Sequence, residues 1–382
     1  MAKNLVRVDM HVHVDGRVNK ENVIKSLVKA QKDKVKKLCL LEHSSLDVLA
    51  PLLEILKEGS LRKYYSGELF VGCEYDNIID AHHTNKDGTN YDGFISHILV
   101  YTSLEDCIKL FNNKTLHMRD REKDYKKDYK KLLNRIKQLK NAEKLEIPTL
   151  EDLKSMDTPH IVKDLQAWVV QNPKRRNDYR VALNTTPRII DHPSDFIRNL
   201  AQDPQGPLFY KPTYAPYTSQ LFKIIRKEAK SAKIILAHPA YMHAQFKTPY
   251  YLETMIDFAK QISPEPFDGI EVCYYLNTPE EQEFLEKYAN KHNFLKTAGS
   301  DSIKVEGEMY FIRNGEKYFF VPKLGTALGA TFDLGKVKIK QQDDRKIIEI
   351  IGGGSPLVVE EDLFEDIKID EKEAYKMLNK EK

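Results

Sequence analysis

The apolar and polar positions of the chain first indicate strands that alternate with helices. Over residues 5–14, apolar side chains occupy every second position, which is the period of a β-strand. Apolar residues then recur at helical spacing over residues 19–30, where Asn19 can cap the helix. A short apolar run follows and ends at His43. This strand–helix–strand order is the unit from which parallel sheets and barrels are built.

The same alternation continues along two further parts of the chain. Strands are expected at residues 69–76, 93–101, 232–239, 268–274 and 293–300. Helices are expected at residues 48–57, 219–229, 252–262 and 279–292. The predicted fold class is therefore α/β, and polar side chains at the carboxyl ends of its strands are the candidates for function.

Between these parts, residues 104 to about 200 are expected to be helical. Leu132, Ile136 and Leu139 form an apolar stripe within a stretch that is dense in charges of both signs. Such mixed charge is typical of a solvated helix face, so it predicts no binding function by itself.

The pattern changes again after residue 302. Asn314-Gly315 lies between two apolar runs and predicts a hairpin, and further strands are expected at residues 336–340 and 347–351. The highly charged residues 360–382 leave two interpretations open, a terminal helix or a disordered tail.

Composition narrows the class of protein. The 382 residues are 41% hydrophobic and 31% charged, which is typical of a globular protein in water. The net charge of +3 is the small difference between 60 basic and 57 acidic residues, so general binding to polyanions is not expected. The four cysteines lie far apart and are expected to be reduced, which favours a cytoplasmic location. No run of about 18 apolar residues occurs, so we expect neither a signal peptide nor a membrane span.

The candidate chemistry lies at the strand ends. His11 and His13 are two positions apart on the first strand and should point to the same face, where two imidazoles can bind one metal ion. The full set of candidate ligands at strand ends is His11, His13, Asp15, His43, Glu74, His97, His238 and Asp301. Imidazoles and carboxylates together suit Zn, Mn or Fe, and a bridging carboxylate such as Glu74 would allow a two-metal site.

These residues occur in a recognisable order of motifs. In chain order the motifs are His11-x-His13 with Asp15, Glu42-His43, Gly72-x-Glu74, His97, Ala237-His238-Pro239 and Gly299-Ser300-Asp301. In this order the chain resembles the PHP (polymerase and histidinol phosphatase) superfamily of metal-dependent phosphoesterases. It is most similar to the TrpH-type branch, which acts on nucleoside 3',5'-bisphosphates and on the 5' ends of short oligoribonucleotides. The resemblance extends over about residues 5–301 and includes the segment around Pro159-His160.

The resemblance implies a distorted seven-stranded (β/α) barrel with a metal cluster at the C-terminal ends of its strands. Residues 1–102 and 217–303 would form the barrel, and residues 103–216 a helical insertion that caps the site. Residues 304–382 would be a β-rich C-terminal extension, for which a lid, a partner surface and an oligomer contact all stay open.

The resemblance also implies two or three divalent metal ions (Mn, Zn or Fe). The ligands of the first ion, which are also the implied catalytic residues, would be His11, His13, Glu74 and Asp301. The second ion would be bound by Glu74, His97 and His238, and a third by Asp15 and His43. The implied mechanism is attack of a metal-activated water on phosphorus. The implied substrate contacts are His160, Arg119 and Arg121.

Two positions depart from the pattern of the superfamily. Ile303 stands where a histidine is usual two residues after the motif aspartate, which weakens the third metal site. Thr158 stands where the branch has an arginine before Pro159, and a threonine cannot grip a phosphate as a guanidinium does. The second phosphate of a bisphosphate would then be held by other residues, or the substrate differs.

Three functions follow as hypotheses. The leading one is a phosphoesterase with a nucleotide or short oligonucleotide as substrate and no membrane partner. The alternatives are a phosphatase of a small metabolite, similar to histidinol phosphatase, and a catalytically inactive PHP scaffold. The sequence leaves the metal, the physiological substrate and the oligomeric state open.

Overall fold

The structure is a computed structural model of the chain. It describes residues 4–14, 18–43, 46–78, 82–84, 90–92, 95–113, 121–154, 161–191, 193–202, 205–210, 218–239, 267–274, 277, 279–302, 309–313, 316–321, 323–327, 337–342, 345–350 and 355–379.

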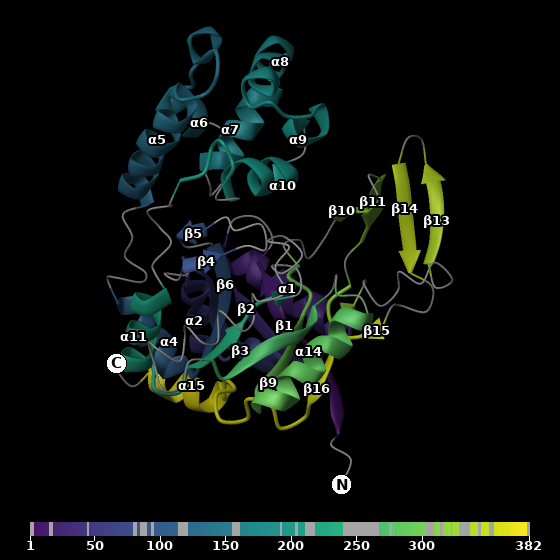
Figure 1. The fold of residues 1–382 in the computed structure, drawn as a ribbon. Coiled ribbons are helices and arrows are strands. Elements are labelled where there is room, and N and C mark those ends of the chain that lie inside the picture. Colours follow the sequence, from purple (N-terminus) through teal and green to yellow (C-terminus); the bar gives the residue numbers. More distant parts are fainter. Residues whose placement is uncertain are drawn as a thin grey trace.

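A strongly curved, eight-stranded sheet forms the centre of the fold (Figure 1). In chain order its strands are β1 (Leu5–His13), β2 (Lys37–Leu41), β3 (Glu68–Ile78), β6 (Ile95–Thr102), β7 (Lys233–Leu236), β8 (Gly269–Tyr274), β9 (Leu295–Gly299) and β16 (Val358–Glu360). Their order across the sheet is β16-β1-β2-β3-β6-β7-β8-β9. All neighbours run parallel except β6, which is antiparallel to β3 and β7, and β16, which is antiparallel to β1.

The two sides of this sheet meet beyond β9. Ser302 forms a parallel bridge with Val12 of β1, and His13 donates a backbone hydrogen bond of 3.0 Å to the Ser302 carbonyl. The sheet is therefore a nearly closed barrel, and the predicted α/β class is confirmed. It has eight strands where the resemblance implies seven. The eighth, β16, pairs with the first half of β1, where β9 is not paired.

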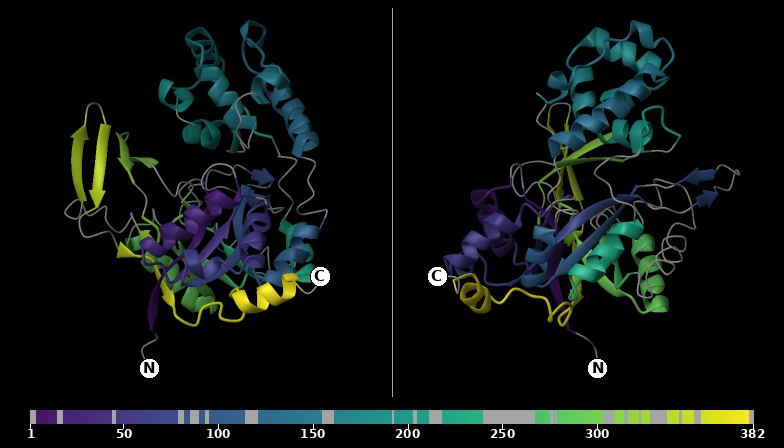
Figure 2. Two further views of the ribbon diagram at one scale, coloured as in Figure 1. Left: turned by 180° about the vertical axis from the view of Figure 1, so that it is seen from behind. Right: turned by 90° about the vertical axis from the view of Figure 1, so that its left-hand side faces the viewer.

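Helices cover the outer face of the barrel (Figures 1 and 2). They are α1 (Lys20–Lys32), α2 (Leu49–Lys57), α3 (Leu61–Tyr64), α4 (Leu104–Asn112), α11 (Thr218–Glu228), α14 (Pro279–His292) and α15 (Glu371–Asn379). Asn19 caps α1 as expected, because its side chain accepts a hydrogen bond from the Asn22 amide. The helix expected at residues 252–262 lies outside the described residues.

The expected alternation of β1 holds only in part. The register between β1 and β2 shifts between Asp9 and Val12. Val8 and Met10 consequently belong to the apolar cluster inside the barrel, whereas Val12 belongs to the cluster beneath the helices. All residues of β1 from Val8 onward are buried, so the strand has no solvent face. This irregularity could not be read from a simple period of two.

The region expected to be helical contains a separate group of helices. They are α5 (Arg121–Lys137), η1 (Ala142–Lys144), α6 (Leu150–Lys154), α7 (Ile161–Val170), α8 (Pro173–Ala182), α9 (Pro187–Asp191), α10 (Pro193–Phe196) and the π-helical turn η2 (Ile197–Gln202). They share an apolar cluster of their own, in which Trp168 and Tyr179 pack edge to face at 6.1 Å. Figure 1 shows this group beside the short strands β4 (His82–Thr84) and β5 (Asn90–Asp92), at the end of the barrel opposite the N-terminus.

The C-terminal part of the chain contains a second sheet. Its order is β10-β11-β14-β13, with β10 (Met309–Arg313), β11 (Glu316–Phe320), β13 (Val337–Gln342) and β14 (Arg345–Ile350). The predicted hairpin is confirmed, because β10 and β11 pair antiparallel with Arg313 opposite Glu316. A small pair, β12 (Thr326–Ala327) with β15 (Ser355–Pro356), connects this sheet to the barrel.

The last described residues belong to the core of the barrel. Leu357, Val359, Phe364 and Ile367 are buried in the apolar cluster inside the barrel, and α15 follows them. Of the two interpretations left open by the sequence, the terminal helix is therefore observed over Glu371–Asn379. Among the described residues, no helix is both long enough and apolar enough to cross a bilayer.

Candidate metal centre

Glu74 of β3 lies at the centre of a cluster of imidazoles and is completely buried. Its Oε1 atom lies 2.8 Å from Nδ1 of His97 and 3.1 Å from Nε2 of His238. Its Oε2 atom lies 2.9 Å from Nδ1 of His43. Each oxygen of one carboxylate therefore faces imidazole nitrogens, which is the geometry of a bridging ligand.

The imidazoles of β1 approach the same oxygen of this carboxylate as His43 does. His11 and His13 each place Nε2 3.2 Å from Glu74 Oε2. Asp301 Oδ1 lies 3.1 Å from His13 Nε2 and 3.5 Å from His11 Nε2. Three sequence-distant segments, β1, β3 and the turn after β9, thus meet at one point.

The strand ends position these side chains. His11 and His13 are in the last three residues of β1, and a parallel bridge places His43, just after β2, beside Glu74. His97 lies near the start of β6, which is antiparallel and therefore enters the barrel at the same end. His238 and Asp301 each follow a parallel strand by two residues, and both have a positive φ, 27° and 47°.

Two ligand groups share Glu74. In one, the ligand atoms of His11, His13, Glu74 and Asp301 all lie within 4.8 Å of one another, and in the other those of His43, Glu74 and His97 do. The first group has the composition that the resemblance implies for the first ion. His43, which was assigned to a third ion, instead lies with the residues of the second. Asp15 and Ile303 lie outside the described residues.

Charge within the cluster is balanced between acids and imidazoles. Burial lowers the pKa of His13, but hydrogen bonds to Asp301 and Glu74 outweigh it and raise the pKa to about 9. Burial likewise opposes protonation of His11 and His97, yet Glu74 raises the pKa of both well above the usual range. Burial would raise the pKa of Glu74, but the surrounding imidazoles hold it well below its usual range. The cluster therefore attracts positive charge, which bound cations can supply in place of protons.

Unused donor atoms lead to the same conclusion. His11 Nε2 and Glu74 Oε2 lie 3.2 Å apart, are buried, and make no hydrogen bond of regular geometry within the described residues. Because lone pairs that face each other across about 3 Å repel unless a proton or a cation lies between them, these atoms fit a metal site. Nitrogen and carboxylate oxygen donors together suit Zn, Mn or Fe.

The sequence reasoning missed three residues that contact candidate ligands and a fourth, Asp9, that contacts the residue before Asp301. Glu271 of β8 lies 3.2 Å from His11 Nδ1, and Asp76 lies 3.0 Å from His97 Nε2. Tyr274 donates a hydrogen bond of 3.0 Å to Asp301 Oδ2. Asp9 accepts one of 2.9 Å from the Ser300 amide. The available signal was the presence of Asp9 and Glu271 inside apolar strand sequences, since a buried carboxylate needs partners.

The helical group adds one cation near the cluster. Burial lowers the pKa of the Lys163 ammonium on α7, and the charges of Asp76 and Asp301 oppose that shift. Lys163 thus interacts electrostatically with two carboxylates of the cluster. The expected substrate contacts cannot be placed in the same way: His160, Arg119 and the side chain of Arg121 lie outside the described residues.

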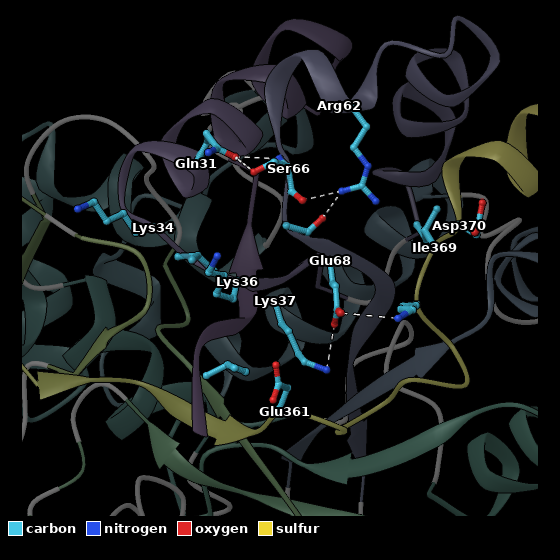
Figure 3. Close-up of a pocket in the computed structure, with 14 residues that line it drawn as sticks. Gln31, Lys34, Lys36, Lys37, Arg62, Ser66, Glu68, Glu361, Ile369 and Asp370 are labelled. Carbon is cyan, nitrogen blue, oxygen red and sulfur yellow. Dashed lines mark hydrogen bonds and ion pairs between the residues drawn. The ribbon is translucent and has the colours of Figure 1, made fainter. Parts of the chain in front are cut away.

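A pocket of about 690 Å³ lies at the opposite end of the barrel (Figure 3). It is lined by the starts of β1, β2 and β3 and by the C-terminal segment. Two of its lysines, Lys37 and Lys368, pair with Glu68 at 3.0 and 3.6 Å. The cluster around Glu74, at the other end of the strands, therefore remains the candidate functional site.

Comparison with known proteins does not assign the chain to a family. No protein-family model and no curated protein matches it. One similar solved structure is a proposed metal-dependent phosphoesterase from Bifidobacterium adolescentis, with a TM-score of 0.44 and 15% identity over 78% of this chain and 87% of that chain. Another is an amidohydrolase from Chromobacterium violaceum with bound sulfate and no metal, with a TM-score of 0.47, 15% identity and the same coverage of 78% and 87%. At these scores the likeness identifies neither a family nor an activity. Fold and cluster define an α/β barrel protein with a candidate metal centre.

Proposed function

We propose that this protein is a metal-dependent hydrolase of phosphate esters, with two divalent ions bound on either side of Glu74. The observation that carries this proposal is the sharing of one fully buried carboxylate between two groups of ligand atoms. Structural metal sites usually saturate one ion with four protein ligands, whereas sharing a carboxylate brings two ions close together.

Each residue has a separate task in the proposed centre. His11, His13 and Asp301 would hold one ion. His43 and His97 would hold the other, together with His238, whose Nε2 atom lies 3.1 Å from Glu74 Oε1. Glu74 would lie between them, because its Oε2 atom faces His11, His13 and His43 and its Oε1 atom faces His97 and His238. Such a pair of ions, when bound, supplies an activated water near neutral pH and neutralises charge on a phosphoryl group.

The proposed substrate is a nucleotide or a short oligonucleotide, as the resemblance in the motif order implies. Support for an anionic substrate comes from the place of Lys163 on α7, where the charges of Asp76 and Asp301 act on its ammonium. An ammonium at this place can attract a phosphate as a compact positive charge. A cytoplasmic location remains a prediction from the sequence.

Metal content and phosphate release, measured on the same preparations, test this function. Substrates would span nucleoside bisphosphates, mononucleotides, short RNA and sugar phosphates. We expect about two ions per chain and release from the nucleotides. Glu74→Gln should lose metal and lower turnover by about 10²-fold or more, because one amide oxygen cannot replace two carboxylate oxygens.

Glu68→Gln is the matched control, since Glu68 begins the same strand but lies at the other end of the barrel. It should keep both metal and activity. Turnover of Glu74→Gln at the wild-type rate would refute the proposal. Absence of metal and of turnover after addition of Mn or Zn would favour the inactive scaffold, and preference for sugar phosphates would favour a metabolite phosphatase.

A further inference from the structure

Glu271 is a buried carboxylate that contacts two candidate ligands without belonging to either ligand group. It lies on β8 and is completely shielded from solvent. Its Oε1 atom lies 3.2 Å from Nδ1 of His11. Its Oε2 atom accepts a hydrogen bond of 2.8 Å from the backbone amide of His238.

The geometry separates this carboxylate from the proposed ions. The two nitrogens of an imidazole lie on opposite edges of the ring. His11 directs Nε2 toward Glu74, at 3.2 Å, and toward Asp301, at 3.5 Å, so its Nδ1 edge faces away from the cluster. Glu271 stands at that rear edge.

A carboxylate in this position determines which nitrogen carries the proton. An ionised carboxylate only accepts, so the contact is a hydrogen bond when Nδ1 of His11 is protonated. In the neutral ring, Nε2 is then left with its lone pair, and it is the nitrogen that faces Glu74 and Asp301.

The surrounding backbone is shaped to allow the contact. A Cβ atom at residue 299 would lie 2.7 Å from Glu271 Oε1 and 2.2 Å from the Cβ of His11, so only glycine fits there. On the other side, Glu271 holds the amide of His238, whose φ of 27° lies in the left-handed region. The side chain of Glu271 thus connects β8 to His11 of β1 and to His238, which follows β7.

We propose that Glu271 is a positioning residue of the metal centre, which fixes the tautomer of His11 and the backbone of His238 through its two oxygens. The proposal rests on the metal-binding part of the proposed function. Glu271 would then affect the affinity for the ions although it binds none of them. Carboxylates that accept from metal-binding histidines typically change affinity by about 10- to 100-fold when they are removed.

The experiment measures zinc affinity by competition with a chelator, which requires no enzymatic activity. We expect Glu271→Ala to bind zinc about 10- to 100-fold more weakly than the wild type. Glu271→Gln should lie between them, because its amide offers one acceptor oxygen where two are used. Thr297→Val is the matched control, since Thr297 is buried on β9 opposite Glu271 and should leave the affinity unchanged.

A second measurement does not depend on the folding of any variant. In the zinc-loaded wild type, ¹⁵N chemical shifts should show His11 protonated at Nδ1 and bound through Nε2. Coordination through Nδ1, or equal affinity of Glu271→Ala and wild type, would overturn the proposal. If the wild type binds no zinc, Mn or Fe, both the positioning role of Glu271 and the proposed function fail. If the wild type releases phosphate but Glu271→Ala does not change zinc affinity, only the positioning role is overturned.

Discussion

Gly299→Ala should damage the candidate metal centre more than it damages the fold. Gly299 ends β9, immediately before the turn that carries Asp301. The added Cβ would lie 2.2 Å from the Cβ of His11 and 2.9 Å from its amide nitrogen. Neither of these atoms belongs to the flexible end of a side chain, so the strands themselves must move apart.

The required movement can be worked from the distances. An ordinary contact begins at 3.4 Å, so the clash of 2.2 Å demands a displacement of about 1.2 Å between β1 and β9. Overpacking of this kind typically costs about 1–3 kcal/mol of folding free energy. A displacement of about 1 Å in a catalytic group can lower the rate by about 10²-fold. We therefore expect a folded protein with greatly reduced metal content and turnover.

Gly67→Ala separates this effect from overpacking in general. A Cβ at Gly67 would lie 2.4 Å from the Tyr65 hydroxyl and 2.6 Å from the Lys36 carbonyl, at the far end of the barrel. Both variants should lower the midpoint of chemical denaturation, but only Gly299→Ala should lose metal in the folded state. Full metal content and normal turnover in a folded Gly299→Ala protein would refute the reasoning.

Two further substitutions test the support of the site and the core. Tyr274→Phe removes the hydrogen bond of 3.0 Å to Asp301. Zinc affinity measured by chelator competition should therefore fall about 10- to 100-fold, while the denaturation midpoint changes little. Unchanged affinity would contradict a supporting role of Tyr274. Phe364→Ala removes a ring packed 5.0 Å from that of Tyr101 inside the barrel, and should cost about 3–5 kcal/mol in denaturant unfolding. A cost below about 1 kcal/mol would show that residues near Phe364 are not part of the barrel core.

Much of the barrel could be predicted from the sequence because buried strands and amphipathic helices leave strong local patterns. The predicted strand at residues 268–274 is observed at Gly269–Tyr274, and the predicted helix at residues 279–292 coincides with α14. The antiparallel direction of β6 was not predictable in this way, since a strand has the same apolar period in either direction. Nor was the pairing of β16 with β1, which joins residues more than 350 positions apart through backbone hydrogen bonds.

The candidate site was predictable as a set of residue types but not as a geometry. Strand-end positions indicated His11, Glu74 and Asp301, because functional side chains gather at the carboxyl ends of strands in such folds. The grouping of His43 with Glu74 depends on the bridge between their backbones, which no local pattern specifies. Glu271 was missed for a related reason, since its partners come from β1 and from the residues after β7.

Two of the candidate ligands stand on a strained backbone, and buried carboxylates stabilise both places. His238 and Asp301 have φ values of 27° and 47°, which side chains other than glycine rarely adopt. Glu271 accepts a hydrogen bond from the backbone amide of His238. Asp9 accepts one from the backbone amide of Ser300, the residue before Asp301. Burial raises the pKa of Asp9 to about 6, so keeping this carboxylate inside the barrel opposes its ionisation.

A strained backbone and buried carboxylates cost free energy of folding, and these costs are unlike those of a site that forms only when metal binds. The strained turns, the buried acids and the glycine at β9 all belong to the fold around the site, which is the pattern of strain stored at functional sites. A ligand that binds only the folded state then stabilises that state by RT ln(1 + c/Kd), where c is the concentration of free ligand, so the gain grows with that concentration. Metal should accordingly raise the unfolding temperature of a chain that is already folded, rather than induce its folding.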